Sequence, residues 1–260
     1  MIKMDLLKKT VKVVISIFVL IGIWELVVLT GRYEQSLLPS PAGVLTGMAE
    51  LIKDGALLTH FKVSLVRFLI GYLAAVITGI TLGLMLGWNK SVWSFIDPVV
   101  QVLRPVSPIA WFPFIVLWFG IGDAPAVVTI FIAGFYPILL STVSGVGNVD
   151  TVYLKVADNF GIRQPQLLFK IILPAAFPLI ANSLHIALGS AWVFLVAGEM
   201  VGAQSGLGFM IIDARNSLRS DLVLAGIIFI GISGLLLDRL IKILESGIKR
   251  QWGVSIEVRN

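Results

Sequence analysis

Six long apolar runs, separated by short polar segments, dominate the pattern of hydrophobic and polar positions in this chain. A helix needs about 20 apolar residues to cross the hydrocarbon core of a bilayer, so we interpret these runs as membrane spans. The third run follows a segment broken by Pro98, Pro105 and Pro108, and its helix is expected to start near Pro105. The pattern predicts an all-α polytopic membrane protein with six transmembrane helices at about 13–29, 65–87, 105–119, 125–146, 175–201 and 222–237.

Polar residues around the first run decide how it is interpreted. Residues 1–12 carry four lysines, as the start of a signal peptide would, but no small-x-small cleavage site follows. We therefore interpret 13–29 as an uncleaved span, in which Glu25 is either an interfacial glutamate or a functional carboxylate.

Pro41 starts a short helix that is predicted to lie on the membrane surface. Its apolar face carries Val44, Met48, Leu51 and Ile52.

Small residues recur at every fourth position along one face of the second predicted span. In lipid such a stripe lets two helix backbones approach closely, and van der Waals contact then drives their association. We therefore predict a packing face, within the subunit or between subunits, rather than a substrate site. The stripe consists of Gly71, Ala75, Gly79, Gly83 and Gly87.

The fifth predicted span is the most polar of the six. Polar groups at membrane depth face protein or a water-filled cavity. Two interpretations stay open for them: hydrogen bonds between helices, or the lining of a translocation path. The residues concerned are Asn182, His185, Gly189 and Ser190, with Glu199 at the far end of the span.

A charged segment, Tyr153 to Pro174, interrupts the apolar runs between the fourth and fifth spans. Val152, Val156 and Phe160 lie four residues apart and predict a short amphipathic helix. Gly161 permits a turn, after which a second short helix is expected to run toward Pro174. Because its charges exclude burial in lipid, this helix–turn–helix is predicted to lie at the membrane surface, available to a soluble partner.

Composition agrees with a membrane protein. Of the 260 residues 57% are hydrophobic and 13% charged, whereas soluble domains carry about 25% charged residues. Cysteine is absent, which excludes disulfides and thiol chemistry. The net charge of +5 is explained by basic residues that set the membrane topology and contact anionic lipid headgroups. No nucleic-acid binding is expected, because no basic patch carries interleaved aromatic residues.

The distribution of lysine and arginine predicts the orientation. With a cytoplasmic N-terminus, 14 of the 20 basic residues fall on the cytoplasmic side, which agrees with the positive-inside rule and also places 153–174 and the C-terminus there. No cation is expected deep in the spans, which argues against a tight anion site without excluding anion passage. The outer six are Arg32, Lys53, Lys62, Arg67, Arg215 and Arg219, and the inner residues are Lys3, Lys8, Lys9, Lys12, Lys90, Arg104, Lys155, Arg163, Lys170, Arg239, Lys242, Lys249, Arg250 and Arg259.

Motifs for enzyme chemistry are missing from the sequence. There is no Gly-x-x-x-x-Gly-Lys-Ser/Thr phosphate loop, no His-x-x-x-His zinc pair and no Gly-x-Ser-x-Gly elbow, so no catalytic, cofactor or metal site is expected. Energy for transport must then come from a partner or an ion gradient. A gradient-driven carrier should have carboxylates in several spans and internal repeats, whereas the only candidate carboxylates are Glu25 and Glu199.

The charged segment resembles the motif of bacterial ABC importer permeases, which has a Glu-Ala-Ala start, a glycine four residues on and a closing Ile-x-Leu-Pro. Gly161 and Ile171-Ile172-Leu173-Pro174 match it, Ala157 fits the second alanine, and Lys155 and Val156 depart from it. Further stretches are similar to the branch that imports nitrate, sulfonates, taurine or bicarbonate. These are LLPSPAGV at 37–44, SLVRFLIGY at 64–72, LRPVSPIAWFPFIVLWFGIG at 103–122 and SGLGFMIIDARNSLRSDLVLAGI at 205–227.

The resemblance implies a type I importer permease in a bacterial or archaeal cytoplasmic membrane. It would have a cytoplasmic N-terminus at 1–12, one permease domain at 13–260 with its core at about 65–246, and coupling helices at 153–174. Two permeases would pair above two ATPase subunits that bind ATP and Mg²⁺, while an extracytoplasmic binding protein meets the loops 120–124 and 203–221. The implied docking residues are Lys155, Val156, Ala157, Asp158, Phe160, Gly161, Ile162, Arg163, Leu173 and Pro174.

Two other classes of function stay open. A self-sufficient secondary carrier or channel would transport when reconstituted alone, and a scaffold without transport would have no binding protein encoded beside it. Among importer substrates, the sequence is compatible with small oxyanions, sulfonates and heterocyclic vitamin precursors.

Overall fold

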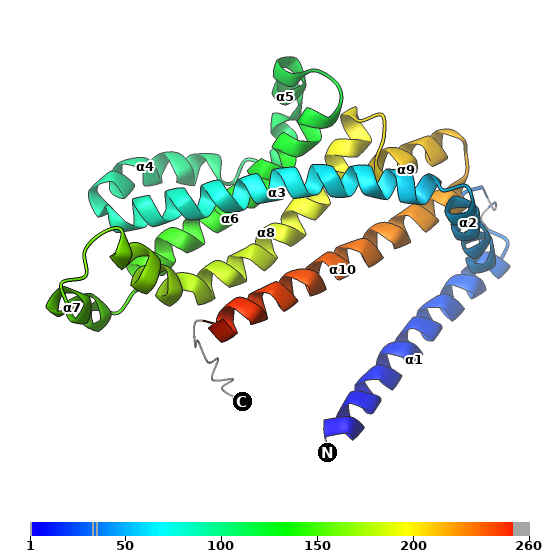
Figure 1. Ribbon diagram of the computed structural model, residues 1–260. Coiled ribbons are helices and arrows are strands. Elements are labelled where there is room, and N and C mark those ends of the chain that lie inside the picture. Colours follow the sequence, from blue (N-terminus) through cyan, green and yellow to red (C-terminus); the bar gives the residue numbers. More distant parts are fainter. Residues whose placement is uncertain (1, 33, 35, 252–260) are drawn as a thin grey trace.

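The computed structural model describes residues 2–32, 34 and 36–251, and these are almost entirely helical (Figure 1). Met1 and residues 252–260, including Arg259, lie outside the described residues. Residues 2–10, 13 and 248–251, with Lys3, Lys8, Lys9, Lys249 and Arg250, are described as backbone only. The elements are α1 (Ile2–Leu29), α2 (Pro41–Lys53), α3 (Ala56–Trp88), α4 (Lys90–Leu103), the 3-10 helix η1 (Pro108–Trp111), α5 (Phe112–Phe119), α6 (Asp123–Gly147), α7 (Thr151–Asn159), the π-turn η2 (Leu168–Ile172), α8 (Leu173–Gly202), α9 (Leu207–Asn216) and α10 (Ser220–Gln251).

Three long helices form the core, with α6 packed between α3 and α8. The predicted stripe of small residues on α3 lies against α6 along its whole length. A Cβ atom added to Gly83 would lie 2.5 Å from the Cβ of Thr142, and one added to Gly71 would lie 2.7 Å from the backbone oxygen of Val127. The stripe is thus a packing face within the subunit, where it brings two backbones into contact.

The contact between α6 and α8 also depends on small residues. A Cβ atom on Gly145 would lie 3.0 Å from that of Ala176, and one on Gly198 would lie 3.3 Å from the Cα of Ala126. The two buried hydroxyls of α6, on Thr129 and Thr142, donate to carbonyl oxygens of their own helix at 2.7 Å. Such internal hydrogen bonds satisfy polar groups in a low-dielectric environment.

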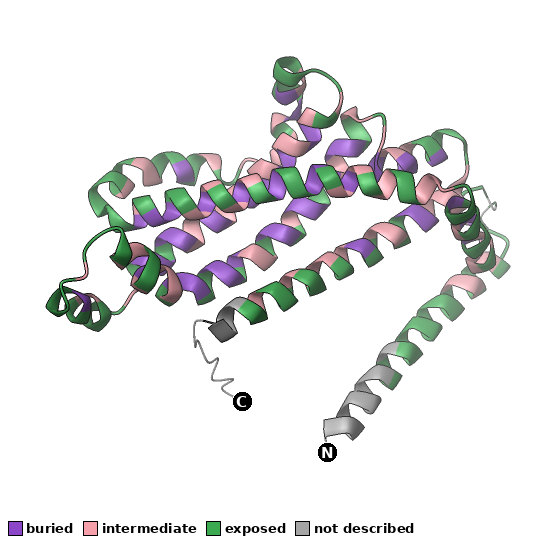
Figure 2. Ribbon diagram, in the orientation of Figure 1, coloured by how far each residue is buried: buried purple, intermediate pink, exposed green. Residues whose placement is uncertain are grey.

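The remaining helices lie around this core. Trp192 on α8 donates through Nε1 to the carbonyl oxygen of Ile230 on α10 at 3.1 Å. Helix α1 stands apart, and its described side chains are mostly exposed, as are many on α10 (Figures 1 and 2). Trp24 joins α1 to the segment before α2 by donating to the carbonyl oxygen of Pro39 at 3.1 Å. Exposed apolar helices of this kind suit contact with lipid or with other membrane subunits.

In the part of the chain that the structure describes, four helices are long and apolar enough to cross a membrane: α3, α6, α10 over Ser220–Gly247, and the helix Leu168–Gly202 that joins η2 to α8. In α1 the apolar part that the structure describes is the shorter Val14–Leu29. Helix α4 and the pair η1–α5 reach the required length only together, with a bend of 84° between them. The helix predicted from near Pro105 to Phe119 covers 108–119 in the structure, as η1 and α5, and is too short to span a membrane without α4. The prolines divide this region, and the sequence prediction lacks the amphipathic α4 before the bend.

We expect Gly83→Leu to weaken the contact between α3 and α6, because its side chain has no space beside Thr142 and Leu139. Overpacking of this kind costs about 1–3 kcal/mol. Thermal unfolding of the purified protein in detergent, followed by circular dichroism, would measure the loss. Gly231→Leu is the matched control, because nothing lies within 4 Å of a Cβ atom at that exposed position on α10. Equal melting temperatures for the two variants would contradict the packing role.

Candidate functional site

The predicted docking segment begins with α7, which projects from one end of the fold (Figure 1). The carboxylate of Asp150 caps the helix by accepting from the backbone N–H of Val152 at 2.9 Å. At the other end Gly161 adopts a φ of +67°, while the N–H groups of Gly161 and Ile162 donate to the carbonyl oxygens of Asp158 and Ala157 at 2.9 Å. This is the Schellman ending, in which glycine takes the left-handed conformation. The turn expected at Gly161 thus has a defined geometry.

The segment has an inner and an outer face. The apolar face predicted for α7 is exposed: Val152 is 58%, Val156 47% and Phe160 79% accessible. On the opposite face Leu154 packs against the cluster formed by Leu84, Val146 and Ile172. Six of the predicted docking residues are exposed. The other four pack inside the segment: Ala157 is buried, and Ile162, Leu173 and Pro174 are half-buried. The exposed residues are Lys155, Val156, Asp158, Phe160, Gly161 and Arg163.

The second short helix expected before Pro174 is not a separate element. The chain enters the π-turn η2 and continues without interruption into α8, with the N–H of Leu173 donating to the carbonyl oxygen of Leu168. Pro174 has no N–H to donate to Lys170, and its ring would clash with that carbonyl in a regular helix. The wider turn accommodates the proline, so the docking segment is joined to α8 by continuous helix.

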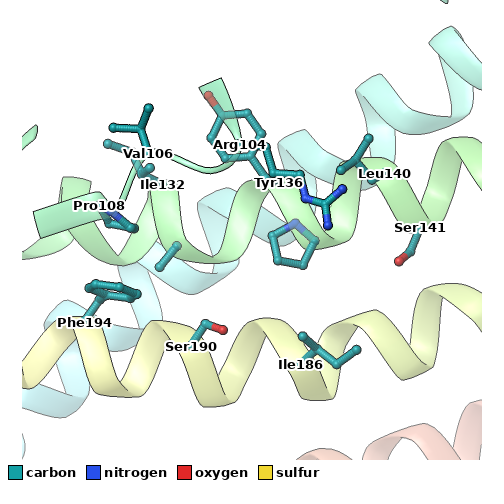
Figure 3. Close-up of a pocket in the computed structure, with 12 residues that line it drawn as sticks. Arg104, Val106, Pro108, Ile132, Tyr136, Leu140, Ser141, Ile186, Ser190 and Phe194 are labelled. Atoms are coloured by element: carbon teal, nitrogen blue, oxygen red, sulfur yellow. The ribbon is translucent and has the colours of Figure 1, made fainter. Parts of the chain in front are cut away.

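A pocket of about 400 Å³ lies between α6, α8 and the break that follows α4 (Figure 3). Ile186, Ser190 and Phe194 line it from α8 at four-residue spacing, which is one face of a helix. Arg104, the residue after α4, extends over α6 beside Tyr136. The polar groups in its lining belong to Arg104, Tyr136, Ser141 and Ser190.

Arg104 lies beside the middle of one of the long core helices. The count of basic residues assigns it to the cytoplasmic side, and that assignment stays a prediction. In the structure it lies beside Tyr136 and Pro137, which are midway along α6. The prolines around Arg104 were the sequence signal for the pocket. They break the helix, and in membrane proteins non-helical backbone is tolerated where it is buried in protein or lines a water-filled cavity.

The polar residues predicted for the translocation path are dispersed. Ser190 lines the pocket, whereas Asn182 and Gly189 are exposed on α8. His185 faces α10, where Nδ1 lies 3.2 Å from Oδ1 of Asp238 and Nε2 contacts Glu245. For His185 the geometry agrees with hydrogen bonding between helices, which is the first of the two interpretations that the sequence left open. Within the described residues no group of His, Asp and Glu side chains is arranged to hold a metal ion.

Glu199 belongs to a buried charged network at the end of the fold where α8 meets α9. Its carboxylate has no exposed surface and accepts from Ser64 Oγ and Arg67 Nη1 at 2.8 Å and from the N–H of Gly208 at 3.0 Å. Arg67 also donates to Asp123 and to the carbonyl oxygen and hydroxyl of Ser205. One guanidinium therefore joins α3 to the start of α6, the end of α8 and the loop before α9. We call these residues the Arg67 network.

A second ion pair fastens the surface helix α2. Arg219, between α9 and α10, donates to Glu50 of α2 at 2.7 Å and to Asp221 at 2.8 Å. The hydrogen bond from Arg219 lowers the pKa of the Glu50 carboxyl. The pair is exposed to solvent, so it positions α2 more than it stabilises the fold.

The sequence as a whole identifies the family. Residues 75–250 match the model of the binding-protein-dependent transport system inner membrane component, which is more than half of the chain. The chain belongs to this family. Members are permease subunits of ABC transporters, as the names of the relatives also indicate.

Several relatives within the family are similar over most of their length. The chain is 34% identical over 239 residues to a putative aliphatic sulfonates transport permease, SsuC of Bacillus subtilis, covering 92% of this chain and 86% of that one. It is 36% identical to the taurine permease TauC of Escherichia coli (86% and 83% covered) and 36% identical to the nitrate import permease NrtB of Synechocystis (92% and 89%).

A solved structure supports the fold of the family. An inward-facing MetNI methionine ABC transporter matches with a TM-score of 0.59 at 17% identity, covering 73% of this chain and 93% of that chain. At this identity the match shows the fold alone, which is that of a type I ABC permease.

We expect Glu199→Ala to destabilise the fold by about 3–5 kcal/mol, because it removes the fully buried carboxylate that pairs with the buried Arg67. Unfolding in detergent, followed by tryptophan fluorescence, measures the difference. Asp123→Asn is the control, since Asp123 pairs with the same guanidinium but its side chain is 75% exposed and should contribute little. A larger effect of Asp123→Asn than of Glu199→Ala would be inconsistent with this account.

Proposed function

We propose that this chain is the transmembrane permease subunit of an ATP-driven ABC importer that works by alternating access. The observation that carries the proposal is the exposed apolar face of α7, which is followed, across the turn at Gly161, by the continuous helix Leu168–Gly202 that lines the pocket at Ser190. Movement of a partner bound at α7 would therefore reach the residues around the pocket. The names of the relatives favour a small solute of the sulfonate, taurine or nitrate type.

The proposed topology has six spans, with α1 as the first and the bent pair of α4 and η1–α5 as the third. Both termini and α7 lie in the cytoplasm, in agreement with the distribution of lysine and arginine. The protein is a multi-pass component of the cytoplasmic membrane, and the Arg67 network then lies at the outer side. This places the pocket between the docking helix and the outer network.

We propose three kinds of partner protein. A second permease, either a copy of this chain or a different permease, completes the path, and two ATPase subunits bind ATP and Mg²⁺ beneath it. The exposed members of the docking segment contact the ATPase, with Phe160 as the largest apolar side chain. The loops 120–124 and 203–221 receive the binding protein. Asn182, His185, Gly189 and Glu199 remain predicted path residues, and Ser190 has the strongest support because it lines the pocket.

Reconstitution separates an importer from a self-sufficient carrier. Vesicles that contain this chain alone should show no solute uptake, and uptake should appear when the ATPase, the binding protein and ATP are supplied, because the chain has no phosphate loop. The measurement is accumulation of labelled solute with ATP or with a non-hydrolysable analogue. Uptake by the permease alone, driven by an ion gradient, would support the carrier instead.

We expect Gly161→Leu to uncouple ATP hydrolysis from uptake while the protein still inserts in the membrane. Nothing lies within 4 Å of a Cβ atom at Gly161, so the effect arises from the backbone, where a left-handed residue other than glycine costs about 1–2 kcal/mol. Gly161→Asn is the control, because asparagine tolerates this conformation. The ratio of solute transported to ATP hydrolysed is the measurement. Normal uptake by Gly161→Leu would count against the docking role.

A further inference from the structure

Arg104 brings an unpaired positive charge to the wall of the pocket. It follows the last residue of α4, where the chain leaves the helix before Pro105 and Pro108. In the described part of the chain its guanidinium forms no hydrogen bond or ion pair, unlike Arg67 and Arg219. Figure 3 shows the side chain beside Tyr136, extending over α6. A cation in this position has no counter-ion among the residues whose side chains the structure describes.

From this we infer that Arg104 is a substrate-selecting residue, and that it binds the oxyanion head of the solute as the solute passes through the pocket. This inference rests on the proposed importer function and specifies its substrate class as small solutes with a singly charged oxyanion head. The guanidinium offers a planar fork of donors that matches carboxylate, sulfonate and nitrate oxygens.

The other groups of the lining suit the same ligand. Tyr136, Ser141 and Ser190 supply hydroxyl groups that can donate to the remaining oxygens of the anion. Pro137, Ile186 and Phe194 form an apolar wall, which accepts the short carbon chain of an aliphatic sulfonate and tolerates nitrate without one. The pocket thus recognises the charged head that these solutes share.

The exposure of Arg104 makes this a site of passage rather than of tight binding. Conduction requires that a ligand bind well enough to enter and weakly enough to leave. An exposed guanidinium attracts the anion while it remains solvated, whereas a buried one such as Arg67 is already occupied by carboxylates. An anionic lipid headgroup offers the same chemistry, so the test below separates it from the transported solute.

The experiment uses the complete importer, reconstituted in vesicles with its ATPase and binding protein. The probes are labelled taurine, nitrate and ethanesulfonate. We expect Arg104→Gln to lower ATP-driven uptake of the transported anion by about tenfold, and Arg104→Lys to retain about half of it, because lysine keeps the charge without the fork. ATP hydrolysis stimulated by the loaded binding protein should stay within about twofold of wild type, since neither the binding protein nor the docking segment is changed.

The matched control is Lys90→Gln, which removes an exposed positive charge from the first residue of the same helix, α4, and should leave uptake unchanged. Wild-type uptake by Arg104→Gln would overturn the inference, and so would a parallel loss of stimulated ATP hydrolysis, because Arg104 would then serve assembly.

Two further arms separate the remaining outcomes. The variants are compared in vesicles of phosphatidylcholine alone and in vesicles that also contain phosphatidylglycerol. A defect confined to the anionic vesicles would assign Arg104 to a lipid headgroup and overturn the solute role. Uptake by the wild-type importer that does not require ATP would contradict the proposed function itself, a result distinct from any difference among the Arg104 variants.

Discussion

The close approach of α3 and α6 is the contact on which the rest of the structure depends. In a bilayer the lipid tails are as apolar as the side chains, so helices associate through packing rather than through exclusion of water. The small residues from Gly71 to Gly87 permit that packing over the length of α3. One side of α6 is held against α3 in this way. Another side of α6 packs against α8, where Gly145 and Gly198 allow close contact. The pocket opens where α6 meets the break after α4.

Helix α8 carries all three features to which we assign a function. It continues directly from the docking segment at Pro174, lines the pocket at Ser190 and ends in the Arg67 network at Glu199. At 1.5 Å per residue, Pro174 and Ser190 are about 24 Å apart along the axis. A stiff helix of this length transmits a displacement at its base to the pocket, whereas a separate second coupling helix would have placed a hinge between them.

The sequence predicts those features that depend on local pattern. The apolar runs indicate four of the spans, and the spacing of small residues indicates which face of α3 packs closely. The motif around Gly161 and Pro174 indicates the family. The sequence does not predict which distant residues form contacts, or in which direction the chain turns at a break. Glu199 and Arg67 are 132 residues apart, and nothing local to either shows that they meet. The prolines near Pro105 show that the chain breaks there, but not that it bends by 84°.

Arg104 illustrates how the break and the chemistry of the pocket are connected. Irregular backbone leaves carbonyl and N–H groups without helical partners, and at membrane depth these groups need water or protein. A polar pocket beside Pro105 and Pro108 meets that need. Because Arg104 is exposed, it does not require a buried carboxylate to be stable, in contrast to Arg67, which is 3% exposed and surrounded by acceptors. The same break between α4 and η1 therefore allows an exposed positive charge beside the pocket, and a solute with an anionic head is the ligand that such a charge favours.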